Sequence, residues 1–543
     1  MKQTGAEVVI SVLLEHQIDT VFGYPGGQVL DLYDALYRHP EIHHILTAHE
    51  QGATHAADGY ARASGKPGVV IATSGPGATN LVTGLAAAHL DSSPVVAITG
   101  NVALPLLGRD SFQEIDIWGI TLPVTKHNFI VKSVSDLADV LRHAFQIAMS
   151  GRPGPVLVDI PKDVQREMVS YTPSDPLPLS ASPTPSEESL LKAANLLQRA
   201  KRPFFYCGGG VTGSGAGQEL LRLAQQMDAP IGCTMMGLSA LPASAHLGLM
   251  GMHGNQEGGQ ALARADVVLA VGMRFSERTT GNKAAFAPNA NIIHIEIDPA
   301  EINKNIPADL SLNGDCKSVL TELIRLTEPV THPTWRKQTA KPHNPAAKPM
   351  TAQWLMETTA GATKDYLVAT DVGQHQMWAA QYYPLSRPHS FLTSGGLGAM
   401  GFGMGAAIGG MLATGRPAVL FTGDGSFGMN LNELATAVSY QLPLLVIVLN
   451  NHALGMVKQW QELFYDGRCS ATLLPHRTVD FAAIAYGFGA QGFRVSTKEE
   501  FQDALRFGTA KRTVTVIDCQ IDPAEKVLPM IPPGGSLENM ILK

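Results

Sequence analysis

The stretch AVLFTGDGSFGMNLNELATAVSYQLPLLVIVLNN, residues 418–451, contains the pattern that decides the fold. Residues 418–421 form an apolar run typical of a buried strand, and the letters GDGS at 423–426 predict a tight loop. A helical pattern then leads to a second apolar run at 444–449, which ends in two asparagines. This order predicts a βαβ unit, whose loops lie at the carboxyl edge of a parallel sheet, where α/β proteins bind ligands.

Asp424 and Asn451 are the residues of this unit that indicate a metal site. The glycines around Asp424 fit G-x-G-x-x-G, which alone would indicate a dinucleotide loop. A carboxylate in a phosphate cradle repels the phosphate unless a cation bridges them, and Mg²⁺ does this with one or two protein side chains, phosphate oxygens and water. Asn451 is the candidate second ligand, and the backbone carbonyl of Ala453 the third. The alternative is a turn aspartate and an unrelated strand-ending asparagine.

Composition excludes several classes of protein. The 543 residues predict two to four domains, and the net charge of −7 gives no electrostatic case for binding nucleic acid or an anionic membrane. Five scattered cysteines without a CxxC pattern indicate a reducing compartment rather than a disulfide framework or a zinc site. No signal peptide is visible, so we expect a cytoplasmic protein. The uncharged, glycine-rich stretch 390–415 predicts a buried helix with its loop, not a membrane span.

Apolar runs and linkers divide the chain into three α/β units. The first covers residues 1–170 and is followed by a Pro/Ser-rich linker at 171–189. The second unit covers 190–330. A second linker, at about 328–350, precedes the third unit at 351–543. The apolar runs within each unit are continuous, as expected for parallel strands that are buried on both faces.

The spacing of GDG at 423–425 and NN at 450–451 resembles the thiamine diphosphate motif of decarboxylases and carboligases. The continuation LGMVKQWQ at 454–461 resembles the catalytic subunits of the acetohydroxyacid synthase (acetolactate synthase) family, and the likeness extends from about Gly5 to Leu542. It implies three consecutive α/β domains with mainly parallel six-stranded sheets. These would bind, in order, the pyrimidine of thiamine diphosphate, FAD, and the diphosphate with Mg²⁺.

Glu50 is the candidate catalytic acid of the first unit. It follows a short predicted strand and precedes an alanine-rich helix, and apolar burial there would raise its pKa toward neutrality. The family resemblance, in HEQG at 49–52, implies a hydrogen bond from Glu50 to the pyrimidine. For Phe112 the alternative is core packing. The other first-unit residues implied by the resemblance are Gly27, Pro76 and Asn80 beside the cofactor, and Phe112, Gln113 and Lys162 along the substrate channel.

Glu50 and the metal site lie on different units, so one cofactor must bridge two units. In the family these units come from two chains, which implies an obligate homodimer or a dimer of dimers.

The second unit carries another glycine-rich loop, GGGVTG at 208–213, directly after a predicted strand. Asp228 lies 20 residues beyond Gly208, which fits a nicotinamide-dinucleotide fingerprint and makes a dehydrogenase an alternative, although a turn explains Asp228 equally well. The resemblance implies a structural FAD instead. The residues that it assigns to FAD are Arg152, Gly208, Gly209, Gly210, Thr234, Met235, Met252, His253, Gly272, Arg274, Glu277 and Glu296.

The segment RFSER at 274–278 departs from the family's usual RFDDR at Ser276. Both arginines and one acid remain, so FAD binding is still implied. Arg278 is assigned to the carboxylate of the second oxoacid, which a planar guanidinium binds with two hydrogen bonds. The FAD-free acetolactate synthases of fermentative metabolism differ in this segment and are the close alternative.

The third unit supplies the remaining candidates. Met400, in SGGLGAMG at 394–401, corresponds to a bulky family residue that bends the cofactor so that its two rings meet, with core packing as the alternative. Trp460 would select the second substrate by contact with the extra methyl group of 2-oxobutyrate, and the tail at 529–536 would close over the site. The cofactor-binding residues implied here are Gln374, His375, Gly398, Met400, Gly425, Ser426 and Met456.

The resemblance implies a carboligase of branched-chain amino acid biosynthesis, on the route to valine and isoleucine. Pyruvate would lose carbon dioxide on thiamine diphosphate and join a second pyruvate or 2-oxobutyrate, giving 2-acetolactate or 2-aceto-2-hydroxybutyrate. A small regulatory subunit is an expected partner. A non-catalytic scaffold is the alternative from another class, and Glu50, Asp424 and Asn451 together argue against it, since a scaffold needs none of them.

Overall fold

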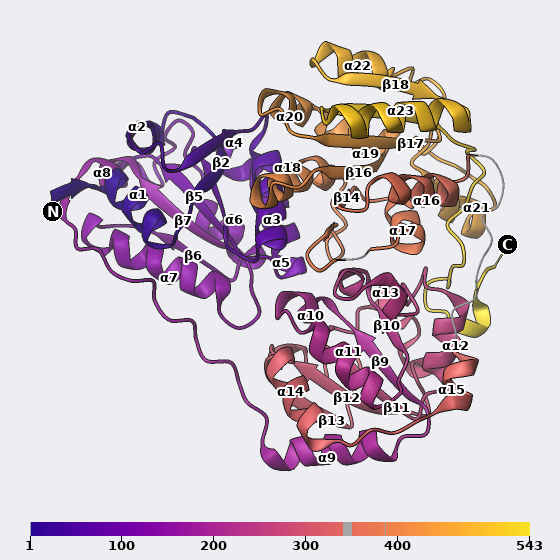
Figure 1. Cartoon of the computed structure of the whole chain (residues 1–543). Helices are drawn as coiled ribbons and strands as arrows, with labels where there is room; N and C mark the ends of the chain where they lie inside the picture. Colours follow the sequence, from indigo (N-terminus) through magenta and orange to yellow (C-terminus); the bar gives the residue numbers. More distant parts are fainter. Residues whose placement is uncertain (1, 340–349, 386, 543) are drawn as a thin grey trace.

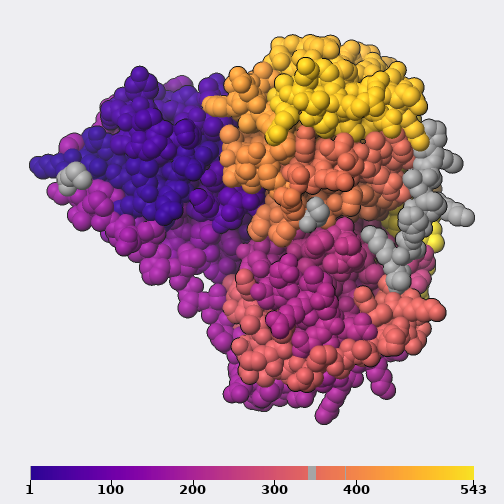
Figure 2. Space-filling model, viewed as in Figure 1, coloured from indigo at the N-terminus to yellow at the C-terminus, as the bar shows by residue number. Residues whose placement is uncertain are grey.

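The computed structural model describes residues 2–339, 350–385 and 387–542, which form three α/β domains in chain order (Figure 1). In Figure 1 the first domain is indigo to purple, the middle domain magenta to salmon, and the third orange to yellow. The space-filling view in Figure 2 shows them as three lobes in contact with one another. The predicted α/β class with mainly parallel sheets is confirmed.

A six-stranded parallel sheet with helices on both faces forms the first domain. In sheet order its strands are β3 (His43–Leu46), β2 (Thr20–Tyr24), β4 (Gly68–Ala72), β5 (Val95–Asn101), β7 (Val156–Pro161) and β6 (His127–Ile130). Its helices are α1 (Gly5–Glu15), α2 (Leu30–Arg38), α3 (Glu50–Ser64), α4 (Pro76–Asn80), α5 (Val82–Asp91), α6 (Ile117–Thr121), α7 (Leu137–Met149) and α8 (Lys162–Arg166). Two short strands, β1 (Lys2–Thr4) and β8 (Met168–Ser170), pair antiparallel and join the two ends of the domain.

Helix α1 begins at a capping box, in which Thr4 accepts from the backbone N–H of Glu7 and Glu7 accepts from that of Thr4. From the end of the first domain, residues 171–186 run without helix or strand to α9 (Glu187–Arg199), as Figure 1 shows. Much of the second predicted linker, residues 340–349, lies outside the described residues.

The middle domain is built on a parallel sheet of five strands among the described residues. In sheet order they are β10 (Ile231–Cys233), β9 (Pro203–Cys207), β11 (Val267–Val271), β12 (Asn291–Glu296) and β13 (Leu310–Asn313). The helices, besides α9, are α10 (Gly209–Gly213), α11 (Gly217–Gln226), α12 (Gln256–Arg264), α13 (Glu277–Thr280), α14 (Cys316–Leu326) and α15 (Pro333–Gln338).

The prediction of six strands is therefore wrong for the middle sheet. At its β10 edge, Leu249 forms a single parallel bridge to Cys233, where a sixth strand would lie. Gly248 and Gly251, on either side, have positive φ values of 103° and 91°, which a strand cannot accommodate. The sixth position is thus reduced to one bridging residue.

The third domain again has a six-stranded parallel sheet. In sheet order its strands are β15 (Phe391–Leu392), β14 (Leu367–Thr370), β16 (Ala418–Gly423), β17 (Leu444–Asn450), β19 (Thr515–Gln520) and β18 (Gln491–Val495). Its helices are α16 (Ala352–Ala362), α17 (Gln374–Tyr382), α18 (Phe402–Thr414), α19 (Asp424–Asn430), α20 (Leu434–Ser439), α21 (Gly455–Phe464), α22 (Phe481–Gly487) and α23 (Lys498–Lys511).

The metal-site unit differs from its prediction in one local respect. The GDGS letters do not form a loop, because α19 begins directly at Asp424. A 3₁₀ turn at Leu431–Glu433 then separates α19 from α20, so the connection between β16 and β17 is two short helices rather than one. The strand–helix–strand order itself is as predicted.

Helices α3 and α18 pack side by side where the first and third domains meet (Figure 1). Their backbones touch, because a Cβ at Gly59 would overlap the carbonyl of Ala406 and one at Gly409 would overlap that of Ala56. Alanines and glycines thus make a rigid, close-packed helix pair across the domain boundary. Helix α18 lies in the uncharged stretch 390–415 and is buried, and within the described chain no helix is long and apolar enough to cross a membrane.

Candidate active site

The carboxyl ends of the first-domain strands bring the predicted pyrimidine-side residues to one edge. Gly27 follows β2, Glu50 follows β3, Pro76 and Asn80 follow β4, and Lys162 follows β7. The Asn80 amide donates to Glu50 Oε2 over 3.0 Å, and Lys162 Nζ donates to the carbonyl of Gly27 over 2.7 Å. Residues from four separate loops therefore lie at the same sheet edge, as ligand-binding residues of a parallel α/β sheet do.

Glu50 is the first residue of α3, and the turn before it is bound by a residue of the third domain. Glu433, fully buried in the third domain, accepts hydrogen bonds from the backbone N–H groups of Ala48 and His49 over 3.2 and 3.1 Å. Glu50 itself is half-buried in the single chain, so the full burial that was expected for it is not present there. No local signal in the sequence pointed to Glu433, because its partners lie almost 400 residues away in the chain.

Phe112 and Gln113 form an exposed turn over the same edge. Phe112 is 85% exposed, so the core-packing alternative for this residue is wrong. Gln113 has a positive φ of 60°, and its backbone lies against Gly75. Further large apolar side chains of this domain are exposed. Tyr24, Leu30, Leu46, Leu106 and Ile115 lie at or after the carboxyl ends of β2, β3 and β5, and Trp118, Ile120 and Leu122 lie on or just after α6.

Asp424 and Asn451 follow neighbouring strand ends of the third domain. Strands β16 and β17 are parallel and in register, with Gly423 opposite Leu449. Asp424 Oδ1 is buried with no hydrogen-bond partner among the described residues, and burial raises the pKa of this carboxyl to about 6. A buried carboxylate oxygen without a hydrogen-bond partner is unfavourable unless a cation binds it.

Asn451 is oriented by a chain of buried amides. Its Nδ2 donates to Gln374 Oε1 over 2.9 Å, so its own Oδ1 faces away from Gln374. Gln374 Nε2 donates to Gln459 Oε1 over 2.9 Å, and that oxygen also accepts from the backbone N–H of Val527 over 2.8 Å. Gln459 Nε2 donates to the Val527 carbonyl over 3.0 Å. Because Val527 presents a fixed donor and acceptor, every amide in the chain has a defined orientation.

The side chain of Gln374 is thus fully used within the protein, and only its backbone, at the start of α17, remains for the predicted diphosphate contact. Ser426 likewise donates its hydroxyl to the Val372 carbonyl over 3.0 Å. His375 Nε2 is buried without a partner in the described structure, and burial lowers the pKa of this imidazole to about 3, so the ring is neutral. A neutral imidazole nitrogen can donate to a diphosphate oxygen.

This donor set fits a divalent ion with a diphosphate. One carboxylate, one amide oxygen and a carbonyl such as that of Ala453 make half of an octahedral shell, and phosphate oxygens and water complete such a shell around Mg²⁺. The described residues contain no cluster of three or more His, Cys, Asp or Glu that could hold a metal, which agrees with a site that uses a single carboxylate.

A cavity of about 1720 Å³ lies where the three domains meet, and Val372 and Gly373, next to Gln374 in the chain, line it. Met400, Gly398 and Met456 line it, and Met400 Cε lies 3.8 Å from the Cβ position of Gly425. Met400 is therefore not a core methionine. Glu50, Pro76 and Asn80 follow strands of the first-domain sheet, whereas Asp424 and Asn451 follow strands of the third-domain sheet, and none of these five residues lines the cavity. In the described chain the two groups therefore form two half-sites on different domains.

The same cavity extends along the middle domain and fits a dinucleotide in size. Buried polar atoms in its wall lack partners among the described residues, namely Ser93 Oγ, Thr212 Oγ1 and His253 Nδ1. Such atoms indicate a polar ligand. The predicted FAD residues that line it are Arg152, Gly209, Gly210, Thr234, Met235, Met252, His253, Gly272, Arg274, Glu277 and Glu296.

Gly208 does not line the cavity. A Cβ at this position would overlap the carbonyl of Gly272, so Gly208 is required for two loops to touch backbone to backbone. Asp228, the residue that suggested a dinucleotide-dependent dehydrogenase, is also absent from the cavity wall. It accepts from the backbone N–H of His332 over 2.5 Å and lies 3.4 Å from Arg336, so it is a turn residue that anchors the segment before α15.

At the far end of the cavity, the Arg278 guanidinium lies over the Trp460 ring, 5.5 Å from its centroid. Arg278 also donates to the sulfur of Met252 over 2.9 Å and is exposed to the cavity. Trp460 is half-buried and lines the cavity, so it is not an aromatic core residue. A cation and an apolar face next to each other suit a small carboxylic acid with an alkyl group.

Comparisons with known proteins agree with this geometry. Family models of thiamine pyrophosphate enzymes match residues 3–120 (N-terminal TPP binding domain), 190–323 (central domain) and 371–519 (C-terminal TPP binding domain). The chain is 42% identical to the acetolactate synthase large subunit of Buchnera aphidicola and to the isozyme 3 large subunit of Escherichia coli, covering 99% of this chain and 98% of each relative. It is 43% identical to a probable acetolactate synthase large subunit of Methanocaldococcus jannaschii, over 99% of this chain and 95% of that relative.

Proposed function

The chain belongs to the family of acetolactate synthase large subunits, and we propose that it condenses two molecules of pyruvate to 2-acetolactate, or pyruvate and 2-oxobutyrate to 2-aceto-2-hydroxybutyrate. Thiamine diphosphate and Mg²⁺ are the cofactors of this reaction, which belongs to branched-chain amino acid biosynthesis. The observation that carries the proposal is the pair formed by Asp424, with its buried and unsatisfied oxygen, and Asn451, with its oriented amide, on adjacent strand ends.

The diphosphate end of the cofactor is the part that the third domain holds. Asp424, Asn451 and the Ala453 carbonyl bind the ion, and His375 donates to the diphosphate. When bound, thiamine diphosphate supplies a nucleophilic carbon that adds to a 2-oxoacid, accepts the electrons left by carbon dioxide and passes a two-carbon unit to a second 2-oxoacid. Met400 lies beside Gly425, where its side chain would support the bound cofactor.

Glu50 is the residue that exchanges a proton with the pyrimidine ring of the cofactor. Asn80 holds its carboxyl by one oxygen, which leaves the other for a ring nitrogen. Glu433 fixes the turn before Glu50 through two backbone hydrogen bonds, so the carboxyl is presented from a rigid helix start.

Two chains complete each site in this proposal. The half-site with Glu50 and the half-site with Asp424 are separate within one chain, and exposed apolar side chains surround the first of them. Leu397, Met429 and Val457 are exposed apolar residues near the second. A symmetric homodimer that places the first domain of one chain against the third domain of the other covers both surfaces and encloses Glu50.

The second oxoacid binds beside the Arg278–Trp460 pair, in contact with both side chains. The guanidinium pairs with its carboxylate, and the indole contacts its alkyl group, so the larger alkyl group of 2-oxobutyrate is favoured. The tail that includes Met530 and Ile531 packs onto Met252 and Gln459, beside this end of the cavity, and excludes water there.

FAD occupies the middle-domain part of the cavity as a structural cofactor. The unsatisfied Thr212 and His253 atoms and the guanidinium of Arg274 support this assignment. The departure of Ser276 from the usual acid leaves the two flanking arginines in place. A purified protein that is yellow and absorbs near 450 nm supports FAD, and a colourless enzyme with full activity places the chain with the FAD-free synthases.

A small regulatory subunit is the proposed protein partner, since the relatives are named as large subunits. All five cysteines are free in the described structure, which supports a reducing compartment such as the cytoplasm.

The test of the proposal is an assay of 2-acetolactate from pyruvate, in which thiamine diphosphate, Mg²⁺ and FAD are omitted in turn. We expect activity to require the first two. Product formation without thiamine diphosphate would refute the proposal, and so would its absence when all three are present. Sedimentation of the active protein tests the dimer, which activity from a monomer would contradict.

A further inference from the structure

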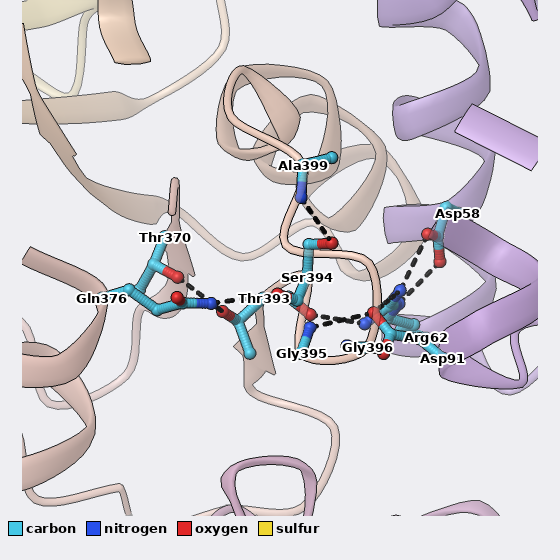
Figure 3. Close-up of polar contacts among 10 residues, drawn as sticks. All are labelled: Asp58, Arg62, Asp91, Thr370, Gln376, Thr393, Ser394, Gly395, Gly396 and Ala399. Atoms are coloured by element: carbon cyan, nitrogen blue, oxygen red, sulfur yellow. Dashed lines mark hydrogen bonds and ion pairs between the residues drawn. The ribbon is translucent and has the colours of Figure 1, made fainter. Parts of the chain in front are cut away.

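A buried ionic network ties the first domain to the loop that carries Met400. Arg62, in the last turn of α3, binds Asp58 of the same helix with two hydrogen bonds of 2.6 and 2.8 Å (Figure 3). It also donates to Asp91, at the end of α5, over 3.0 Å, and to the carbonyl of Thr393 in the third domain over 2.7 Å. One guanidinium thus joins two first-domain helices to the segment after β15.

Asp91 binds the same loop directly, in addition to the contact that Arg62 makes with Thr393. Its two oxygens accept from the backbone N–H groups of Gly395 and Gly396 over 3.1 and 2.6 Å. Gly396 must be glycine here, because a Cβ would lie 2.9 Å from Asp91 Oδ1 and from Leu90. The Asp58 and Asp91 side chains are completely buried, and that of Arg62 is 11% exposed.

The third domain holds the loop at both ends. At its end, Asn430 donates to the carbonyl of Gly401 over 2.6 Å, and two side chains hold its beginning. Gln376 donates to Thr393 Oγ1 over 2.8 Å and to the Ser394 carbonyl over 3.1 Å, and the hydroxyls of Thr370 and Thr393 lie 2.7 Å apart (Figure 3). Ser394 then accepts from the N–H of Ala399 over 3.1 Å. Between these points, Gly395 and Gly396 are bound through Asp91, across the domain boundary.

The network contains one cation, Arg62, and two carboxylates, Asp58 and Asp91. The negative charge that Arg62 does not balance is stabilised by the backbone N–H groups of the loop that bind Asp91. Burial raises the pKa of Asp91, while Arg62 and the amide of Gly396 oppose this effect. A lysine at position 62 would keep the charge but could not contact Asp58, Asp91 and Thr393 together, because only a guanidinium has donors in the required planar array. The geometry of the loop is therefore sensitive to the shape of this side chain, not only to its charge.

We propose that Arg62 and Asp91 are positioning residues for catalysis, which hold the Met400 loop (residues 393–401) in the shape that places Met400 against the cofactor. This inference rests on the proposed function. Met400 lies only four residues after Gly396, which Asp91 binds. Its Cε lies 3.8 Å from the point where a Cβ at Gly425 would be. A shift of the loop at Gly396 therefore shifts Met400 as well. A displacement of about 1 Å in such a support lowers turnover by about 100-fold.

The helix that carries Arg62 also carries Glu50 at its other end. In the proposed dimer these two residues serve different sites: Glu50 serves a site completed by the partner chain, and Arg62 serves the Met400 loop of its own chain. An effect of Arg62 through the loop can therefore be separated from a general distortion of α3, which would act through Glu50.

The first experiment compares Arg62→Lys and Asp91→Asn with wild type. We expect kcat to fall about 10- to 100-fold, with KM for pyruvate within about threefold, because the substrate contacts are untouched. Arg142→Lys is the control: Arg142 is another buried guanidinium with two hydrogen bonds to a carboxylate, Glu15, but unlike Arg62 and Asp91 it does not line the cavity. It should lower the melting temperature without changing kcat. Unchanged kcat in both test variants would overturn the proposal.

A second measurement does not depend on activity. The methyl resonance of Met400 in ¹³C-methyl-methionine-labelled protein, identified by its loss in Met400→Leu, should shift in Arg62→Lys and stay in place in Arg142→Lys. If wild type makes no acetolactate, the proposed function fails, yet this signal still decides whether Arg62 positions Met400. If the chemical shift of the Met400 methyl group is the same in Arg62→Lys as in wild type, the positioning role is refuted.

Mixed dimers, purified through two different tags, separate the two routes. A dimer of one Glu50→Gln chain and one Arg62→Lys chain should keep half of the wild-type kcat, because both defects fall in the same site. A kcat close to half that of the Arg62→Lys dimer would show instead that Arg62 acts through α3 and Glu50, and would overturn the proposal. A dimer of Glu50→Gln and Met400→Ala chains is the control: half of the wild-type kcat supports sites shared between chains, and a lower value overturns the shared site.

Discussion

The side-chain amide of Asn451 donates to Gln374 Oε1 over 2.9 Å, and this contact determines where the Asn451 carbonyl oxygen points. The orientation is relayed from the backbone of Val527 through Gln459 and Gln374, which are both buried. A ligand of the proposed ion is thus aligned by the segment that leads to the C-terminal tail. Partners of this kind, which orient metal ligands, change metal affinity when they are removed.

Replacement of Gln459 with leucine is predicted to weaken binding of the ion. Without the relay, Gln374 can turn and Asn451 loses its defined orientation, so the Mg²⁺ concentration for half-maximal activity should rise about 10- to 100-fold. Gln353→Leu is the control, since that amide donates only to Glu357 of the same helix at the surface. Equal Mg²⁺ requirements in the two variants would show that the relay does not set the orientation of Asn451.

Replacement of Glu50 with glutamine should leave the fold intact and abolish most of the turnover. The hydrogen bond from Asn80 can be kept by the new amide oxygen, but no proton can be given to the pyrimidine. Loss of a general acid–base group typically lowers kcat by about 10²- to 10⁴-fold. The assay is steady-state acetolactate formation together with thiamine diphosphate binding, which should also weaken. Near-normal turnover would remove Glu50 from the mechanism.

Replacement of Trp460 with leucine is predicted to change the choice of second substrate. The ring over which Arg278 lies is lost, and with it the contact for the extra methyl group of 2-oxobutyrate. The ratio of acetohydroxybutyrate to acetolactate, in a competition of the two oxoacids, should fall by roughly tenfold or more. Trp354→Leu, which alters an indole outside the cavity that packs on Phe501, should leave this ratio unchanged.

The Glu15–Arg142 pair predicts a pH-dependent contribution to stability. Burial alone would raise the pKa of Glu15, but hydrogen bonds from Arg142, Tyr171 and Ser174 lower it from 4.5 to about 2. The unfolded chain therefore takes up the proton first as the pH falls. The stabilisation is complete above about pH 4.5 and disappears as the pH falls toward 2, and it amounts to about 3 kcal/mol at most.

Glu15→Gln should accordingly have a lower free energy of unfolding than wild type at pH 7. The difference in free energy between the two proteins, followed by thermal unfolding, should shrink between pH 4.5 and pH 2. Glu188→Gln, at an exposed ion pair with Lys192, should have no measurable effect at either pH. A constant difference across this range would mean that the charge of Glu15 does not stabilise the first domain.

The sequence was sufficient to predict that Asp424 and Asn451 lie at neighbouring strand ends, because both residues are local signals at the ends of apolar runs. Asp424 and Asn451 each follow a strand, and adjacent parallel strands must bring their ends together. The start of α19 at Asp424 was missed because two glycines suggest a loop, although helix formation there is supported by the packing of Phe427 against Phe481. Tertiary contacts of this kind override local propensity.

The supporting residues could not be predicted in the same way. Gln459, Glu433 and Arg62 act on residues that are 85, about 385 and 331 positions away in the chain, respectively. An arginine four residues after an aspartate on a helix is usually a surface ion pair, so Asp58 and Arg62 gave no signal of a buried network. The expectation of six strands in the middle sheet came from the family resemblance, and the positive φ values of Gly248 and Gly251 limit the sixth position to one bridge at Leu249.

The most direct test of the central claim is the binding of Mn²⁺, as a paramagnetic substitute for Mg²⁺, followed by electron paramagnetic resonance with and without thiamine diphosphate. We expect one tightly bound ion per chain, which requires thiamine diphosphate and is lost in Asp424→Ala. An ion that binds with the same stoichiometry and affinity in Asp424→Ala, or independently of the cofactor, would contradict this claim.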